Sequence, residues 1–124
     1  MYTLDTNAII YYLNGEPSVA RILDDVFDKE EPIYVSAMTE LELFSHRLLT
    51  EDDSDTITRL LASTVIVPVD SQLARFAGFL RRQTPRLKAA DSAIAATALL
   101  TNTTLVTRNV RDFQQIDTLQ LLEI

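Results

Sequence analysis

Short apolar runs alternate with longer amphipathic stretches along this chain. The short runs are rich in β-branched and aromatic residues and carry no charge, a pattern typical of buried strands. They predict five strands, at residues 2–4, 32–35, 65–67, 104–106 and 119–122. The third run is entirely β-branched, so we expect it to be buried on both faces of a sheet.

The segments between these runs have apolar residues at helical spacing. They predict helices at residues 6–13, 18–28, 37–49 and 54–63, one that Asp70 and Ser71 cap and Thr84-Pro85 ends, one at 89–100, and a helical turn at 110–113. Strands that alternate with helices form βα units. The 124 residues therefore predict one α/β domain, residues 1–124, with a central parallel sheet covered on both faces.

Polar residues follow three of the predicted strands. Asp5 follows the first, Ser36 the second and Thr107 the fourth. In parallel α/β sheets, ligands bind beyond the carboxyl ends of the strands. We therefore expect these side chains on one edge of the sheet, where a functional site would form.

Two acids at predicted helix starts, Asp5 and Asp91, are candidate metal ligands. Capping or a first-turn charge explains each one taken alone. Together on one edge, however, they would repel each other unless a cation lay between them. The chain has no cysteine and one histidine, His46, which we expect on an exposed part of a helix. An all-oxygen site of this kind favours Mg²⁺ or Mn²⁺ over Zn²⁺.

A net charge of −7 at first disfavours a polyanionic partner. The charge is unevenly distributed, because residues 75–111 contain seven of the eleven bases and one acid. The local distribution therefore permits binding to a nucleic acid. The missing cysteines, the absence of a secretory signal and the absence of a long apolar run predict a cytoplasmic protein with no membrane segment.

Four segments resemble the sequence motifs of the PIN-domain family. They are Leu4-Asp5-Thr6-Asn7, the Ser-Ala-x-Thr-x-x-Glu-Leu pattern in residues 35–43, the Asp that opens an alanine-rich helix in residues 90–96, and Thr-x-Asn-x-x-Asp-Phe in residues 105–113. Their order and spacing agree over nearly the whole chain. The length resembles that of the VapC-type toxins of bacterial toxin–antitoxin pairs.

The resemblance implies a three-layer α/β/α PIN-like domain and an endoribonuclease that uses Mg²⁺ or Mn²⁺ and a metal-activated water. Matched by position, Asp5, Glu42 and Asp91 would hold the metal and act in catalysis. Glu42 matches rather than Glu40 because it lies three residues after Thr39, although helical periodicity does not choose between them. Cleavage would leave a 5′-phosphate and a 3′-hydroxyl.

The fourth acidic position departs from the pattern. Many relatives have an Asp where this chain has Asn109, and Asp112 lies three residues later, so either could complete the catalytic site. Two further groups of residues are candidates. The first would orient the carboxylates, although capping of a turn would also explain it; the second would contact the RNA backbone, although a solvated surface would also explain it. The orienting groups are Thr6, Asn7 and Thr107, and the basic contacts are Arg108 and Arg111.

The resemblance also implies partners. A toxin-like nuclease needs a restraining antitoxin, which would fill the groove near the carboxylates. A homodimer is also expected, with candidate surface on the apolar helices between Ser54 and Leu80. Two other classes remain open. One is a catalytically degenerate PIN-fold binding protein. The other is a receiver-like signalling domain, which paired acids after the first strand and a Lys after a late strand would favour, and this chain has neither.

Overall fold

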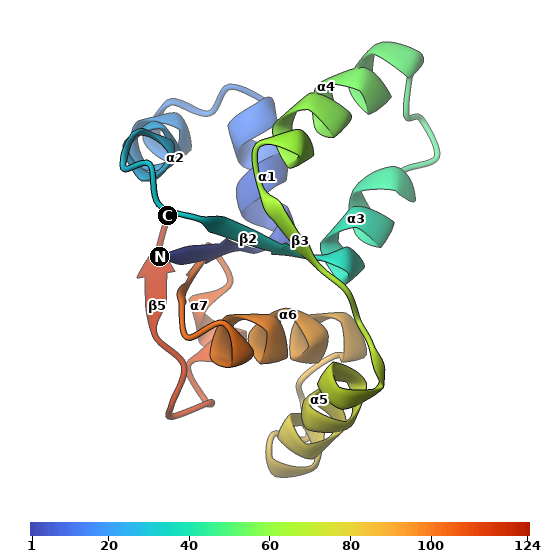
Figure 1. Cartoon of the computed structure of the whole chain (residues 1–124), viewed down its shortest axis with the longest axis vertical. Coiled ribbons are helices and arrows are strands. Elements are labelled where there is room, and N and C mark those ends of the chain that lie inside the picture. Colours follow the sequence, from blue (N-terminus) through green and yellow to red (C-terminus); the bar gives the residue numbers. More distant parts are fainter.

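The computed structural model describes residues 1–124 and has a five-stranded sheet at its centre (Figure 1). The strands run in the order β3-β2-β1-β4-β5, and every neighbouring pair is parallel. They are β1 (Tyr2–Leu4), β2 (Ile33–Ser36), β3 (Val65–Val67), β4 (Thr104–Thr107) and β5 (Leu121–Glu123). The predicted α/β class with a central parallel sheet is therefore confirmed.

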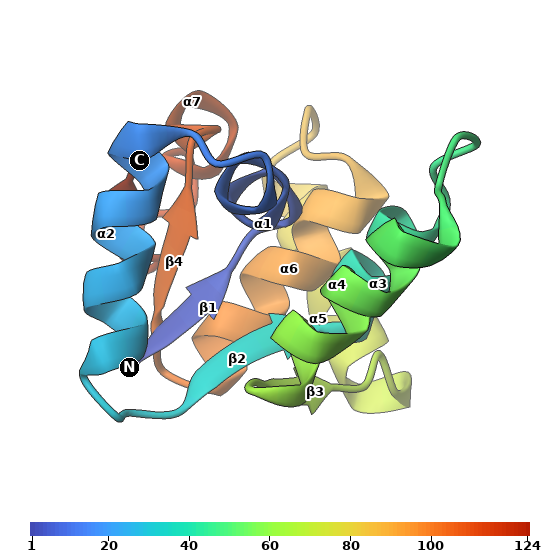
Figure 2. The same ribbon diagram turned by 90° about the horizontal axis from the view of Figure 1, so that it is seen from above.

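Helices cover both faces of this sheet. They are α1 (Thr6–Leu13), α2 (Pro17–Asp28), α3 (Ala37–Phe44), α4 (Glu51–Ala62), α5 (Ser71–Gln83), α6 (Ala89–Leu100) and α7 (Val110–Phe113). Helices α1, α2 and α4 lie on one face, and α5, α6 and α7 lie on the other (Figures 1 and 2). Each layer has its own apolar core against the sheet, as expected of a three-layer domain.

Helix α6 is the most deeply buried helix. Seven consecutive residues, Ser92 to Ala98, are buried, and four of them are alanines. Small side chains let the helix axis approach the sheet closely, and Ile94 fills the space that remains. This close packing fixes the start of α6, where Asp91 lies, against the carboxyl edge of the sheet.

Two predictions about local structure are wrong. Strand β3 lies at the edge of the sheet and none of its residues is buried: Val65 is 48% exposed, and Ile66 and Val67 are partly buried. The helix predicted at residues 37–49 ends at Phe44, because Ser45 caps it and its hydroxyl donates to the carbonyl of Leu41. The residues that follow form a turn, closed by a hydrogen bond from the Leu49 amide to the carbonyl of His46.

Element boundaries differ elsewhere by one to three residues. Helix α4 begins at Glu51 rather than Ser54, because the side chains of Thr50 and Asp53 form a capping box. Strand β5 begins at Leu121, two residues later than the apolar run at 119 suggests. No helix of the chain is both long and apolar enough to span a bilayer.

Candidate active site

The strand order creates a crevice between β1 and β4. The chain starts in the middle of the sheet, proceeds from β1 to β2 and β3 on one side, and crosses to β4 and β5 on the other. Loops leaving β1 and β4 therefore diverge at their carboxyl ends, which is where open α/β sheets bind ligands. Asp5 directly follows β1, and Thr107 is the last residue of β4.

Both carboxylate oxygens of Asp5 are held by neighbouring donors. Asp5 is the N-cap of α1, and its Oδ1 accepts a hydrogen bond from the Thr6 amide at 2.8 Å. Its Oδ2 accepts one from the Thr107 hydroxyl at 2.7 Å. The side chain is only 3% exposed, so its position is fixed by β1, α1 and β4 together.

Glu42 reaches the same region from α3. The Thr6 hydroxyl donates to Oε1 of Glu42 at 2.6 Å and lies 3.0 Å from the Thr39 hydroxyl. Helix α3 begins after Ser36, whose Oγ accepts from the amide of Met38, so the end of β2 sets its direction. No such hydrogen bond reaches Glu40. Sequence reasoning used Thr39 only to align Glu42 and missed that its own side chain is buried beside Thr6.

Asp91 lies in the first turn of α6 and does not cap that helix. The N-cap is Lys88, and no side chain caps the amides of the helix start. Burial is the main cause that raises the pKa of Asp91, and the negative charges of Glu42 and Asp112 raise it further. The positive charge of Lys88 acts in the opposite direction.

The carboxyl group of Asp5 responds to its neighbours in the same way. Burial raises the pKa of Asp5 to about 6, and the charges of Asp91 and Glu42 contribute in the same direction. The hydrogen bonds from Thr107 and Thr6 oppose this rise only in part. Three acids far apart in the sequence therefore share one electrostatic environment. No three acids or imidazoles, however, lie close enough together to ligate a common ion as they stand.

Asn109 and Asp112 are joined to each other at the end of β4. The Asn109 side-chain amide donates to Oδ2 of Asp112 at 2.9 Å. The backbone amide of Asn109 donates to the Thr107 hydroxyl, which in turn donates to Asp5. Asn109 therefore connects two carboxylates rather than standing alone, and it is Asp112 whose charge reaches Asp91.

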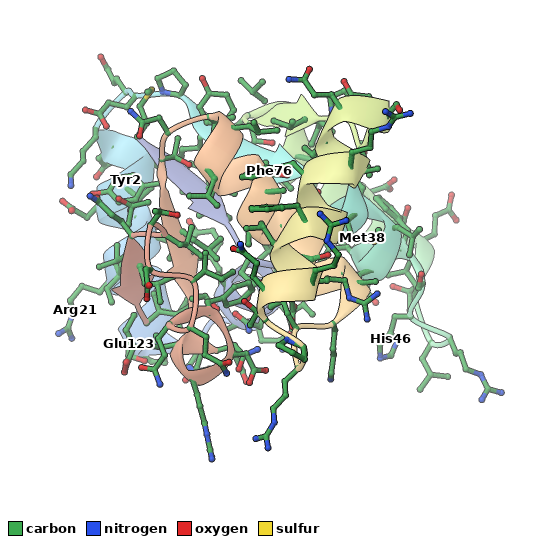
Figure 3. The ribbon with its side chains drawn as sticks, turned by 90° about the horizontal axis from the view of Figure 1, so that it is seen from below. Tyr2, Arg21, Met38, His46, Phe76 and Glu123 are labelled. Atoms are coloured by element: carbon green, nitrogen blue, oxygen red, sulfur yellow. The ribbon has the colours of Figure 1, made fainter.

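The remaining candidates lie at the margin of this site. The Arg108 guanidinium lies 2.8 Å from Oε1 of Glu16, 4.1 Å from the Tyr11 ring centroid, and donates to the carbonyl of Ile124. Its backbone amide donates to Oδ1 of Asn7 at 3.3 Å. Arg111 is exposed on α7 and forms no salt bridge. His46 is not helical as expected but lies in the exposed connection between α3 and α4 (Figure 3).

The sequence profile of the PIN domain matches residues 2–119. The chain therefore belongs to the PIN domain family. It is 29% identical over 124 residues to ribonuclease VapC19 of Mycobacterium tuberculosis, covering 97% of this chain and 98% of that protein. It is 28% identical to ribonuclease VapC1 of Haemophilus influenzae (strain R2866) over 127 residues, covering 97% and 95% of the two chains.

Solved structures show the same fold along their whole length. A VapBC2 structure from Rickettsia felis, bound to a promoter DNA fragment, contains a chain that matches with a TM-score of 0.83 and 26% identity over 99% of this chain and 98% of that one. FitAcB from Neisseria gonorrhoeae matches with a TM-score of 0.79 and 28% identity over 99% and 97%. These matches confirm the predicted resemblance and the PIN fold.

The raised pKa of Asp5 predicts that its ionised form destabilises the folded protein. Because the folded pKa, about 6, lies above the ordinary value of 3.8, stability is lost as the pH rises from about 4 through about 6. Asp5→Asn keeps an oxygen for the Thr6 amide and removes the charge. In chelator at pH 7.5, urea unfolding should show this variant to be more stable by about 2 kcal/mol, and at pH 4 the gain should vanish.

Asp55→Asn is the matched control, because it removes one exposed acid from α4. It should change stability by less than about 0.5 kcal/mol at either pH. If Asp5→Asn were no more stable than the wild type at pH 7.5, the account of Asp5 as a strained buried charge would be wrong.

Proposed function

We propose that this protein is a metal-dependent endoribonuclease and the toxin of a type II toxin–antitoxin pair. One observation carries the proposal: Asp5, Glu42 and Asp91 interact electrostatically at the carboxyl edge of a PIN-fold sheet, and the pKa of Asp5 is raised to about 6. The relatives named above as ribonucleases match it over nearly their whole length, which supports the same activity here.

The residues of the site fit a hard divalent cation. Every candidate ligand is a carboxylate oxygen, and Nδ1 of the single histidine, His46, accepts from the Leu48 amide, so Mg²⁺ or Mn²⁺ suits the site better than Zn²⁺. A cation would offset both the cost of burial and the smaller repulsion between acids, which together raise the pKa of Asp5 and Asp91. Because no three carboxylates yet reach a common point, binding has to draw these side chains together.

When bound, such an ion lowers the pKa of a coordinated water and acts as a Lewis acid toward a phosphate oxygen. The chain's own residues supply position. The Thr6 amide and the Thr107 hydroxyl fix Asp5, and this hydrogen bonding orients its oxygens. The Thr6 hydroxyl fixes Oε1 of Glu42. Oε2 of Glu42 is left to hold a second ion or to position the water, and in-line attack would leave a 5′-phosphate and a 3′-hydroxyl.

Asp91→Asn should abolish RNA cleavage and leave the fold intact. The loss should exceed about 100-fold, because substitution of groups that only orient metal ligands already costs 10- to 100-fold. Incubation of purified protein with mixed RNAs in Mg²⁺ or Mn²⁺, with and without chelator, measures it. Asp117→Asn, which removes an exposed acid beyond α7, is the control and should cleave normally. Equal cleavage by the Asp91 and control variants would reject the assignment.

We also propose that Asp112 is the fourth carboxylate of the site and that Asn109 positions it. Asp112→Asn should then raise the Mg²⁺ concentration needed for half-maximal cleavage by more than about 10-fold. Asn109→Ala should raise it by on the order of 10-fold, because Asp112 loses the amide that holds it. Metal titrations of cleavage would measure both. Unchanged metal dependence in Asp112→Asn would exclude Asp112 from the site.

An antitoxin would bind in a groove that opens beside Glu42. The groove lies between α1, α3 and α4 and has a volume of about 400 Å³. Half of its lining is apolar, including Ile10, Leu13, Leu43 and Ile57, and the rest is polar, with the acids Glu42 and Asp53 beside His46, Asn14 and Thr56. Several apolar residues on these helices and the loop after α3 are exposed, including Ile10 and Leu41. Apolar walls with acids among them suit an amphipathic segment that carries a basic residue. The solved VapBC structures support an antitoxin partner.

Ile10→Asp should therefore prevent capture of that partner without affecting cleavage. Tagged protein purified from its native cells should retain one small protein that carries a basic segment, and the variant should lose it. Leu100→Asp, an exposed apolar residue at the end of α6, is the control and should retain the partner. Retention by both variants would place the contact elsewhere.

A homodimer remains a prediction, with exposed Val65, Val69 and Phe79 as its candidate surface. A cytoplasmic location also remains a prediction. The receiver-like alternative finds no support, because the chain belongs to the PIN family. The alternative of a degenerate binding protein is decided by the same cleavage assay.

A further inference from the structure

The positive charge of this acidic protein is concentrated in one segment. Residues 71–90 contain five of the eleven bases and none of the eighteen acids. They form α5 and the loop that leads to α6. None of these five bases forms a salt bridge, whereas Lys29 and Arg108 pair with Asp25 and Glu16. The segment therefore presents uncompensated positive charge.

The loop between α5 and α6 holds two of these bases in place. Leu87 is buried, with 2% exposure, while Arg86 and Lys88 on either side of it are exposed. The Leu87 amide donates to the carbonyl of Thr84, and Nε of Arg81 donates to the carbonyl of Leu87 at 3.0 Å. Because Leu87 anchors the loop inward, Arg86 and Lys88 are both directed outward from a fixed backbone.

A third base continues this surface along α5. Arg82 lies in the last turn of α5, and its guanidinium lies 5.8 Å from the centroid of the Phe79 ring, which limits its orientations. At the other end, Lys88 precedes α6 and lies close enough to Asp91 for their charges to interact. Helices α5 and α6 lie side by side (Figure 3). We call Arg82, Arg86 and Lys88 the basic strip.

We propose that the basic strip binds the phosphate backbone of single-stranded RNA on its way to the carboxylates. This inference rests on the proposed ribonuclease function and adds a path for its substrate. Three exposed cations without salt bridges, the last of them beside Asp91, have the charge that a polyanion needs, and single strands are bound by positively charged surfaces of this kind. Arg108 is less suited to this task than the sequence suggests, because its guanidinium is already engaged by Glu16, Tyr11 and Ile124.

The basic strip also lies apart from the groove proposed for the antitoxin. That groove, between α1, α3 and α4, contains Glu42 and Asp53, whose charges repel phosphate. The strip lies on the other layer of the domain, on α5 and before α6. RNA and a basic antitoxin segment would thus approach the carboxylates from two sides of opposite charge.

The test compares the double variant Arg82→Ala/Arg86→Ala with the control Arg21→Ala/Arg59→Ala. The control removes two exposed arginines from α2 and α4 and makes the same change in net charge. Binding of a labelled 20-nucleotide RNA of mixed sequence is measured in chelator over a range of salt concentrations. Log K falls as log salt rises. In the strip variant this slope should become less steep by about 1.4, since each lost contact to a single strand contributes about 0.7. The control should keep the wild-type slope.

Cleavage in Mg²⁺ gives a second readout. The strip variant should raise KM by about 10-fold and keep kcat within about twofold, because it removes phosphate contacts and leaves the carboxylates in place. Arg82→Lys/Arg86→Lys retains the charge and should restore most of the affinity. Lys88 lies beside Asp91, so Lys88→Gln could also change the affinity for metal. This variant is therefore assayed over a range of metal concentrations, and a KM for RNA that stays raised at saturating metal supports the inference.

Three results would overturn the inference. They are equal losses in the strip and control variants, unchanged RNA binding in the strip variant, or an altered oligomeric state in size-exclusion chromatography with normal RNA binding, which would mark a contact between copies. If the wild type cleaved RNA and the strip variants had its KM, only the path would be wrong. If the wild type failed to cleave RNA in Mg²⁺ or Mn²⁺, the proposed function itself would fail.

Discussion

The burial of the Asp5 carboxylate constrains the rest of this structure. The group is placed where β1 ends and α1 begins, and it is hydrogen-bonded to both α1 and β4 through Thr6 and Thr107. Water cannot solvate it, so its charge is costly, and the acids of α3 and α6 increase that cost. The fold therefore holds Asp5 in an unfavourable electrostatic state that a bound cation would relieve. The folded protein loses some stability at the residues of the proposed site.

The elements around this group are arranged so that its partners converge. Thr6 is the central residue, because its amide binds Asp5 and its hydroxyl binds Glu42. Thr107 has the same role on the other side, since it donates to Asp5 and accepts from the amide of Asn109. Asp91, by contrast, has no hydrogen-bond partner at the helix start and is positioned only by the packing of α6. Two acids are thus fixed by hydroxyl groups and one by the backbone alone.

The sequence predicts most of this arrangement because its signals are local. Asp5, Ser36 and Thr107 could be placed on one edge from the period of the strands alone, and the alanine-rich run of α6 placed Asp91. Features that depend on contacts between distant segments were not predicted. Nothing in Val65-Ile66-Val67 says that β3 is an edge strand, since strand order depends on pairings between distant segments. Nor could local pattern show that Arg108 pairs with Glu16, 92 residues away, or that Asn109 holds Asp112.

Charge distribution shows how an acidic protein could take a polyanion as substrate, as the proposed function requires. The acids of the proposed site are few, with Asp5 buried and the others partly buried at the edge of the sheet, where a divalent ion would reverse the local potential. The remaining acids lie mostly on α2, α4 and the segments beside them, away from α5. The bases of α5 and its loop are left unpaired, so their field is not cancelled at short range. Net charge bears on the solubility of such a protein, whereas the proposed binding of RNA depends on where Arg82, Arg86 and Lys88 lie relative to Asp91.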